Sequence, residues 1–263
     1  MTMKACKVLA GIGLAFMTVV SVQAQTVLLD FGNDSTFRGK STSGNWNSLS
    51  GGAFSSNLID TAGSATTIDF GPDGMGATDS FNAPGYSGQY SGWSGLTPAQ
   101  QQAAIDQMAL DADAAIDNAA LGDLGEGTAA MDFYSSTGGR FQLQQVTPGQ
   151  PYDLTFYSAK KFPVDDDSTT ITVYDDSGYS NSLGSVTLFH GDATGAANTN
   201  QLATISNLIG PSNANNIFYV EFAGDSGGTG YINSMSLTVV PEPSTFTLIG
   251  LACAGLAFLR RRR

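Results

Sequence analysis

The body of the chain alternates hydrophobic and polar residues with the two-residue period of half-buried β-strands. Between residues 152 and 156, for example, Tyr152, Leu154 and Phe156 alternate with Asp153 and Thr155. β-Branched and aromatic residues dominate such segments, and clusters of Gly, Ser, Asn and Asp separate them. We therefore expect strands at residues 26–31, 66–70, 130–134, 139–146, 152–159, 169–175, 184–190, 216–222 and 230–240.

One segment follows the helical period instead. Thr97 and Pro98 suit the N-cap and the first position of a helix, and apolar residues then recur at three- and four-residue spacing. The pattern predicts a helix over about residues 98–120, which Gly122 and Gly125 end. Its four aspartates are expected on a solvated face: Asp106, Asp111, Asp113 and Asp117. Many strands with one inserted α-helix indicate an all-β sandwich and not an alternating β-α fold.

The first 24 residues form a separate segment. Lys4 and Lys7 precede an almost wholly apolar run from Val8 to Val22, and Ala24 offers a small residue after it. This order of basic, apolar and small residues is typical of a secretory signal peptide. We expect a signal peptidase to cut after Ala24, so that residues 1–24 are a signal peptide and residues 25–239 are the exported domain.

The last 24 residues also differ from the body. Pro241 and Pro243 stop any regular element that reaches them, and residues 244–259 are uncharged and mostly apolar. A helix there spans roughly 24 Å, which is less than the ~30 Å hydrocarbon core of a bilayer. The sequence predicts a short membrane helix that holds the body outside the cytoplasmic membrane. Four terminal arginines are expected to stay cytoplasmic: Arg260, Arg261, Arg262 and Arg263.

Pro241, Glu242 and Pro243, the apolar segment and the arginine cluster together resemble the PEP-CTERM sorting tail of Gram-negative bacteria that make exopolysaccharide. The resemblance covers residues 240–263 alone. It implies that a membrane-embedded exosortase recognises the tail, cuts near the Pro-Glu-Pro motif, and releases or transfers the protein outward. The expected location is the cell surface or the extracellular space, after transient anchoring in the inner membrane. A plain single-pass anchor is the alternative.

The body carries a second resemblance. VLLDFG and NWNSL near its start, FQLQQVTPGQPYDLTFYSA in its middle and GYINSMSLTVV at its end resemble pieces of galactose-binding-like jelly-roll domains in exported bacterial proteins. This resemblance implies a jelly-roll-like β-sandwich over most of residues 26–239. Domains of this kind often bind glycans, and some serve only as structural modules, so both functions stay open.

The body is strongly acidic. Residues 25–240 hold 22 of the 23 acidic side chains and five of the 11 basic ones, and the whole chain has a net charge of −12. Nucleic acid is excluded as a partner because phosphate binding needs clustered Lys and Arg, and contact with a membrane is expected through the tail alone. Cys6 and Cys253 lie in the end segments, so the body holds no thiol for catalysis, disulfides or a cysteine metal site.

The stretch AGDSGG at residues 223–228 matches the surroundings of the nucleophile in chymotrypsin-like proteases. His190 is the sole histidine that could serve Ser226 as a base, and it lies much closer in sequence than in that family. A hairpin rich in Gly, Ser and Asp explains the stretch without a catalytic role. We expect no catalytic residue and no enzyme, with a secreted hydrolase as an alternative.

Clustered carboxylates make calcium the one cofactor hypothesis, because calcium takes about six to eight oxygen ligands that acidic loops can supply. Asp165, Asp166 and Asp167 lie in one such loop. No spacing in the chain fits the EF-hand loop, and a solubilising charge cluster is the alternative. Thermal melts with calcium and with a chelator would distinguish the two.

Exposed aromatic rings can stack on the C–H faces of sugars, which makes four aromatic residues candidates for glycan contact. Tyr86, Tyr90 and Trp93 lie in a loop rich in Gly and Ser, and Trp46 lies between two asparagines whose amides can bond hydroxyl groups. Large aromatic residues also anchor loops to a core. The leading hypothesis is an exported, non-enzymatic β-sandwich that contacts extracellular polysaccharide, and a purely structural surface or matrix component is the alternative.

Overall fold

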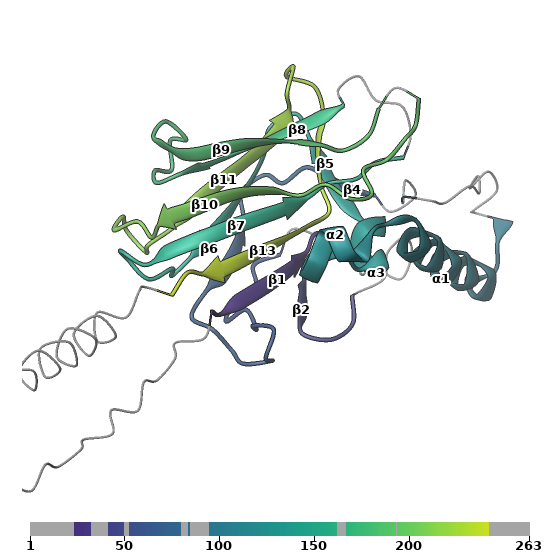
Figure 1. Cartoon of the computed structure of the whole chain (residues 1–263), viewed down its shortest axis with the longest axis horizontal. Coiled ribbons are helices and arrows are strands. Elements are labelled where there is room, and N and C mark those ends of the chain that lie inside the picture. Colours follow the sequence, from purple (N-terminus) through teal and green to yellow (C-terminus); the bar gives the residue numbers. More distant parts are fainter. Residues whose placement is uncertain are drawn as a thin grey trace, which may run out of the picture. The chain divides into compact units, whose positions relative to one another are not determined.

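Two five-stranded sheets and a smaller three-stranded sheet make up most of the protein (Figure 1). The computed structural model describes residues 24–32, 42–49, 53–79, 84, 95–161, 167–192 and 194–241. The predicted signal peptide through Gln23 and the predicted membrane helix at 244–259 lie outside these residues. Among the helices that the described residues form, none is both long and apolar enough to cross a membrane.

The first sheet has the order β10-β7-β13-β1-β2, and the second has the order β3-β6-β11-β8-β9. Neighbouring strands are antiparallel in both sheets, except that β1 and β2 run parallel. The first sheet consists of β10 (Ala203–Ile209), β7 (Pro151–Tyr157), β13 (Ser234–Val239), β1 (Thr26–Asp30) and β2 (Trp46–Ser48). The second consists of β3 (Asp69–Pro72), β6 (Gly139–Gln144), β11 (Phe218–Gly224), β8 (Ser168–Tyr174) and β9 (Ser182–Phe189). The small sheet joins β12 (Gly230–Ile232), β5 (Phe133–Ser136) and β4 (Ala77–Asp79).

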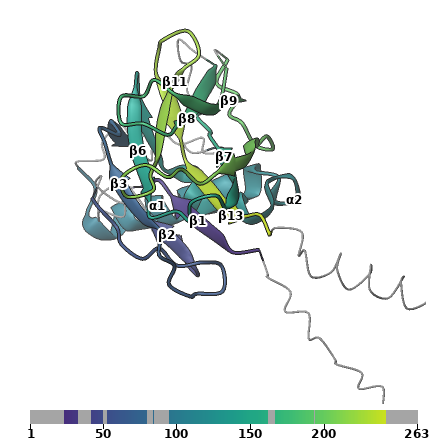
Figure 2. The same cartoon turned by 90° about the vertical axis from the view of Figure 1, so that its left-hand side faces the viewer.

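The hydrophobic core lies between the two large sheets, which Figure 2 shows as separate layers. Alternate residues of each strand enter it, as the period of two predicts: Val27 and Leu29 from β1 meet Phe141 and Leu143 from β6 in one cluster. The rings of Phe31 and Phe141 lie 5.2 Å apart between centroids. Full burial of one such ring stabilises the fold by about 1.5–3 kcal/mol. The predicted sandwich-like, mostly β architecture is confirmed.

The predicted helix is shorter than the sequence suggested. Helix α1 spans Pro98–Ala115 and begins with a capping box. The Thr97 hydroxyl accepts from the Gln100 N–H, and the Gln100 side-chain oxygen accepts from the Thr97 N–H. It ends because Ile116 is extended, and Asp117 then caps a new helix, α2 (Asn118–Leu121). Asp117 is therefore a cap and not part of a solvated helix face, because its carboxylate accepts from the backbone of Ala119 and Ala120.

Two further short helices follow, and they correct the strand expected at residues 130–134. A 3₁₀ helix spans Gly122–Leu124, and α3 spans Gly127–Met131. Strand β5 begins only at Phe133. The helices pack on the outer face of the first sheet, where Ile105 and Met108 of α1 join Leu28 of β1 in a second apolar cluster (Figure 1). Tertiary burial of the Ala-Met stretch under α1 therefore overrides its strand-like pattern.

Two more differences concern strands near the C-terminus. The segment expected as one strand at 230–240 is divided at Asn233, so that β12 and β13 belong to different sheets. Strand β10 was not predicted, because a bulge at Asn207, with φ of 57°, interrupts its alternation. The remaining predicted strands agree with the structure to within a few residues of their ends.

Candidate functional site

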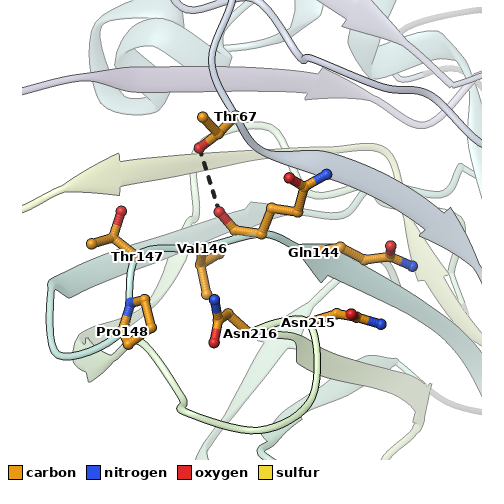
Figure 3. Close-up of a pocket in the computed structure, with 8 residues that line it drawn as sticks. Thr67, Gln144, Val146, Thr147, Pro148, Asn215 and Asn216 are labelled. Atoms are coloured by element: carbon orange, nitrogen blue, oxygen red, sulfur yellow. Dashed lines mark hydrogen bonds between the residues drawn. The ribbon is translucent and has the colours of Figure 1, made fainter.

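An open groove of about 630 Å³ lies at one end of the sandwich, where β6 ends and the segment before β11 begins. Every residue that lines it is uncharged: Thr67, Gln144, Gln145, Val146, Thr147, Pro148, Asn215 and Asn216. We call this the amide groove, because four of its eight residues carry side-chain amides. Figure 3 shows the side chains of Gln144, Asn215 and Asn216 around it.

One wall is the turn that connects β6 to β7. Gly149 has a φ of 78°, and Gln150 N–H donates to the Thr147 carbonyl at 3.2 Å, which is the geometry of a type II turn after Pro148. The stretch TPGQP at residues 147–151 thus forms the turn between the two strands. The backbone N–H of Thr147 donates to the Tyr152 hydroxyl at 2.8 Å and fixes the turn against β7.

The opposite wall is the segment 213–217. Gln145 N–H donates to the Asn215 carbonyl at 3.1 Å, and Val146 N–H donates to the Asn216 carbonyl at 3.2 Å, so main-chain bonds join the two walls beyond the end of the β6–β11 pairing. The side chain of Asn213 holds this segment, because it donates to the Ile217 carbonyl and accepts from the Ile217 N–H. The groove is therefore built on main-chain bonds. The Gln144 side chain donates to the Gln142 side chain at 2.8 Å and the Gln145 side chain donates to Asp69, whereas the bonds described for Asn215 and Asn216 are made by the main chain.

Three groove residues have left-handed backbone: Gln145, Asn215 and Asn216, with φ of 60°, 68° and 51°. They are half of the six non-glycine residues with positive φ in the described part of the chain. Asn tolerates this region, whereas for Gln it is unusual. For Gln145 the cost is about 1–3 kcal/mol, and strained backbone of this kind gathers at binding sites.

The groove is neutral within an acidic protein. No charged residue occurs between Asp192 and Glu221, or between Arg140 and Asp153, and these stretches supply every lining residue except Thr67. The nearest carboxylate described is Asp69, which is buried, accepts from Asn57 N–H at 2.8 Å and also accepts from the Gln145 side chain. Amides and hydroxyls that donate and accept without charge suit a ligand that is polar and neutral.

A second groove of about 470 Å³ shows the contrast. It lies between α1 and α3 and contains three carboxylates, from Asp106, Asp113 and Glu126. Among the described residues no group of three or more potential metal ligands is close enough to hold an ion. The second groove therefore differs from the amide groove in its acidic lining.

An aromatic cluster lies on the outer face of the second sheet, beside the amide groove. The rings of Tyr174 and Tyr219 each contact the ring of Tyr179 edge to face, and the Arg140 guanidinium stands 4.1 Å from the centre of the Tyr179 ring. The hydrogen bond to Glu221 raises the pKa of Arg140, and burial raises that of the Tyr179 hydroxyl. Nothing in the linear sequence marked this cluster, because its members come from β6, β8, β11 and a hairpin.

The hairpin that carries Tyr179 is tied by one carboxylate. Asp176 accepts from the N–H groups of Gly178, Ser180 and Asn181. These bonds favour the ionised form and lower the pKa of Asp176, with the bond from Asn181 as the largest cause. The hairpin also joins the groove wall, because the Asn213 side chain donates to the Asp175 carbonyl at 2.6 Å.

Of the four aromatic residues that the sequence suggested for glycan contact, Trp46 is described. It is partly buried and packs against the apolar cluster under the helices. The side chain of its neighbour Asn47 donates to the carbonyls of Leu28 and Ile59 and accepts from the Ile59 N–H. This amide therefore joins β1 to the segment at Ile59 and is not available to a ligand. Tyr86, Tyr90 and Trp93 lie outside the described residues.

Of the three suggested calcium ligands, Asp167 is the one among the described residues. Asp167 accepts from the Ser168 hydroxyl at 3.0 Å, and its carbonyl accepts from the N–H groups of His190 and Gly191. Asp165 and Asp166 lie outside the described residues. Calcium binding by this cluster stays a prediction, to be tested by the melts described above.

His190 and Ser226 occupy separate environments. His190 is fully buried, and its Nδ1 lies 3.0 Å from the Thr169 hydroxyl. That hydroxyl also accepts from Tyr231 N–H. Ser226 is exposed in the hairpin between β11 and β12, as the sequence indicated. The described contacts give Ser226 no histidine partner.

Comparison with known proteins identifies the end of the chain. Residues 239–263 match the PEP-CTERM protein-sorting motif. Pro241 is described and exposed, whereas Glu242, Pro243 and Arg260, Arg261, Arg262 and Arg263 lie outside the described residues. No curated protein matches the sequence.

Among solved structures, an arabinose-bound α-L-arabinofuranosidase matches with 14% identity and a TM-score of 0.26. The match covers 41% of this chain and 19% of that chain, and it carries no argument about this protein.

Proposed function

Because the chain ends in a PEP-CTERM sorting motif, we propose that it is an exported, exosortase-sorted protein of the cell surface or extracellular matrix, and that its domain binds a neutral glycan in the amide groove. The sorting motif supports the first half of this proposal. The groove supports the second half. The role is binding and not catalysis, since the groove holds no acid, base or nucleophile among its lining residues apart from the Thr67 and Thr147 hydroxyls.

The strand order supports a jelly roll for this domain. Four strands of the first sheet have the order β10-β7-β13-β1, and four of the second have the order β6-β11-β8-β9. Along the chain these strands pass from sheet to sheet, except at the β8–β9 hairpin, as successive strands of a jelly roll do. This topology is consistent with the galactose-binding-like resemblance of the sequence.

The single observation that carries glycan binding is the groove's chemistry. Sugar hydroxyls both donate and accept hydrogen bonds, and side-chain amides can match both roles in one group. A neutral groove avoids the cost of desolvating a charge on binding. The bonds from Gln145 N–H and Val146 N–H to the carbonyls of Asn215 and Asn216 hold the main chain of the groove in place before any ligand arrives, which lowers the entropy lost on binding.

The test is binding of the mature protein to arrays of neutral and uronic-acid polysaccharides, followed by titration calorimetry with the best neutral oligosaccharide. Asn215→Gly and Asn216→Gly each remove a groove amide at a positive φ that glycine adopts readily, and each should weaken binding about ten-fold, which matches the loss of a well-placed hydrogen bond. Gln201→Ala, at an exposed glutamine before β10, is the matched control and should bind as the parent does. Equal affinity of all three variants would remove the groove from the proposal, and a silent array would leave the structural surface component as the function.

A further inference from the structure

The sorting motif begins inside the folded domain. Its match starts at Val239, and Val239 is the last residue of β13. Strand β13 is a central strand, paired with β1 on one side and with β7 on the other. Its backbone groups are therefore already used, and a protease that binds its substrate as an extended strand cannot pair with them while the sheet is intact.

The two residues that lead to the Pro-Glu-Pro motif are also held. Val239 N–H donates to the Gln25 carbonyl at 2.8 Å, and Val240 N–H donates to the Pro151 carbonyl at 2.9 Å. The Val240 carbonyl accepts from the Gln150 side-chain amide at 2.7 Å. Both valines are partly buried, whereas Pro241 is exposed. The hydrogen bonds of the folded domain thus extend to Val240, the residue directly before Pro241 of the Pro-Glu-Pro motif.

The opposite end of the chain contributes to the same arrangement. Gln25 is the first residue after the predicted signal-peptide cut, and it bonds to Val239. Thr26 pairs with Thr238, and their hydroxyls lie 3.1 Å apart. The Gln25 side chain also donates to the Asp60 carboxylate at 3.2 Å. The site of the first processing step therefore lies next to the segment that precedes the second.

We infer that the folded domain sets where the sorting protease cuts: the sheet and the Gln150 side chain hold the chain through Val240 and confine cleavage to its C-terminal side. Gln150 acts here as a positioning residue. It belongs to the turn that forms one wall of the amide groove, but the inference rests on the sorting motif and on these bonds, and not on glycan binding.

The protease step is hydrolysis or transfer at a peptide bond on the C-terminal side of Val240. The carbonyl carbon gains the attacking oxygen or nitrogen, and the amine of the following residue leaves with a proton. Such a step needs the scissile bond in an extended, accessible backbone. The N–H of Val240 is hydrogen-bonded to β7, and its carbonyl is hydrogen-bonded to the preceding turn. The peptide bonds N-terminal to Val240 are therefore inaccessible to the protease.

The experiment uses the full-length chain expressed with its exosortase, and it reads the C-terminus of the mature protein by intact mass. The inference expects a single mature end at Val240 or later. Gln150→Ala and Gln150→Glu both remove the donor to Val240, and they should give an additional end at Val239, the last residue that the sheet still holds. Gln201→Ala is the control with an unchanged end.

A second measurement does not depend on the exosortase. The full-length protein in detergent is treated with a protease of broad specificity, and trimming past Val240 is followed over time by mass. Loss of one hydrogen bond should make this trimming roughly three- to ten-fold faster in Gln150→Ala, while hydrogen exchange at Leu237 stays as in the parent. A parent end before Val240, an unprocessed tail, or equal trimming of Gln150→Ala and the parent would each overturn the inference.

Discussion

Two sets of asparagines in this protein have opposite roles. Asn233 is fully buried between β12 and β13, and its side chain donates to the carbonyls of Ala130 and Asp132 and accepts from Ala159 N–H. Asn215 and Asn216 in the amide groove are at least partly exposed, and the bonds described for them are made by the main chain. The same amide therefore serves as an internal tie in one place and as a surface for contacts in the other.

The difference teaches how to separate structural from functional polar residues. A buried amide with all its bonds made to backbone joins segments that no sheet joins, as Asn233 joins α3 to β13. An exposed amide on a backbone fixed by other bonds contributes little to folding. It is free to be selected for binding. This rule moves Asn47 out of the candidate site and brings Asn215 and Asn216 into it.

The largest expected effect is on the buried set. Asn233→Ala leaves two carbonyls and one N–H without partners in the core, and it should lower the free energy of unfolding by about 3–5 kcal/mol. Asn215→Gly removes a groove amide at a φ of 68° that glycine adopts readily, so the change should stay within about 0.5 kcal/mol. Urea denaturation of both variants measures the contrast. Similar losses in the two would show that the groove asparagine is also an internal tie.

A smaller effect is expected at the glycine that supports the groove wall. A Cβ on Gly210 would lie 2.1 Å from the Thr147 carbonyl oxygen, so Gly210→Ala must displace the turn and should cost about 2 kcal/mol. Gly138→Ala is the matched control, because a Cβ there meets nothing within 4 Å. Thermal melts test the stability difference, and glycan titration tests whether the displaced turn weakens binding. Normal glycan affinity in a destabilised Gly210→Ala would separate the turn from the binding surface.

The smallest effect concerns the hairpin beside the groove and its dependence on pH. Because the pKa of Asp176 is lowered in the folded state, its carboxylate supports the hairpin above about pH 4 and loses this effect as pH falls through the folded-state pKa. Protection of the Ser180 and Asn181 amides from hydrogen exchange should therefore drop in acid. Asp176→Asn should flatten this dependence, whereas Asp225→Asn should keep it. A flat profile in the parent protein would contradict the assignment.

The sequence predicted the strands well where the pattern was local. Segments such as 152–156 alternate without interruption, and the structure places their apolar residues in the core. The failures occurred where a single residue redirects the chain. Ile116 ends α1, Asn207 bulges β10, and Asn233 divides the last strands between sheets. Each of these depends on contacts with distant segments, which a local pattern does not contain.

The candidate site was not predictable from the sequence for the same reason. Thr67, Gln145 and Asn216 are far apart along the chain, and uncharged amides in loops carry no signal of their own. The local patterns suggested a glycan contact at Trp46 and a nucleophile at Ser226. In the structure Trp46 packs against the second apolar cluster, and Ser226 is exposed in a hairpin.

By itself, the sequence determined that strands dominate the domain and that a sorting tail follows it, because alternation and a linear motif are properties of neighbouring residues. Only the tertiary structure decided which amides are buried ties, which line a groove, and how far order extends toward the tail. Those properties arise when the β6–β7 turn, the segment before β11 and the end of β13 meet at one end of the sandwich.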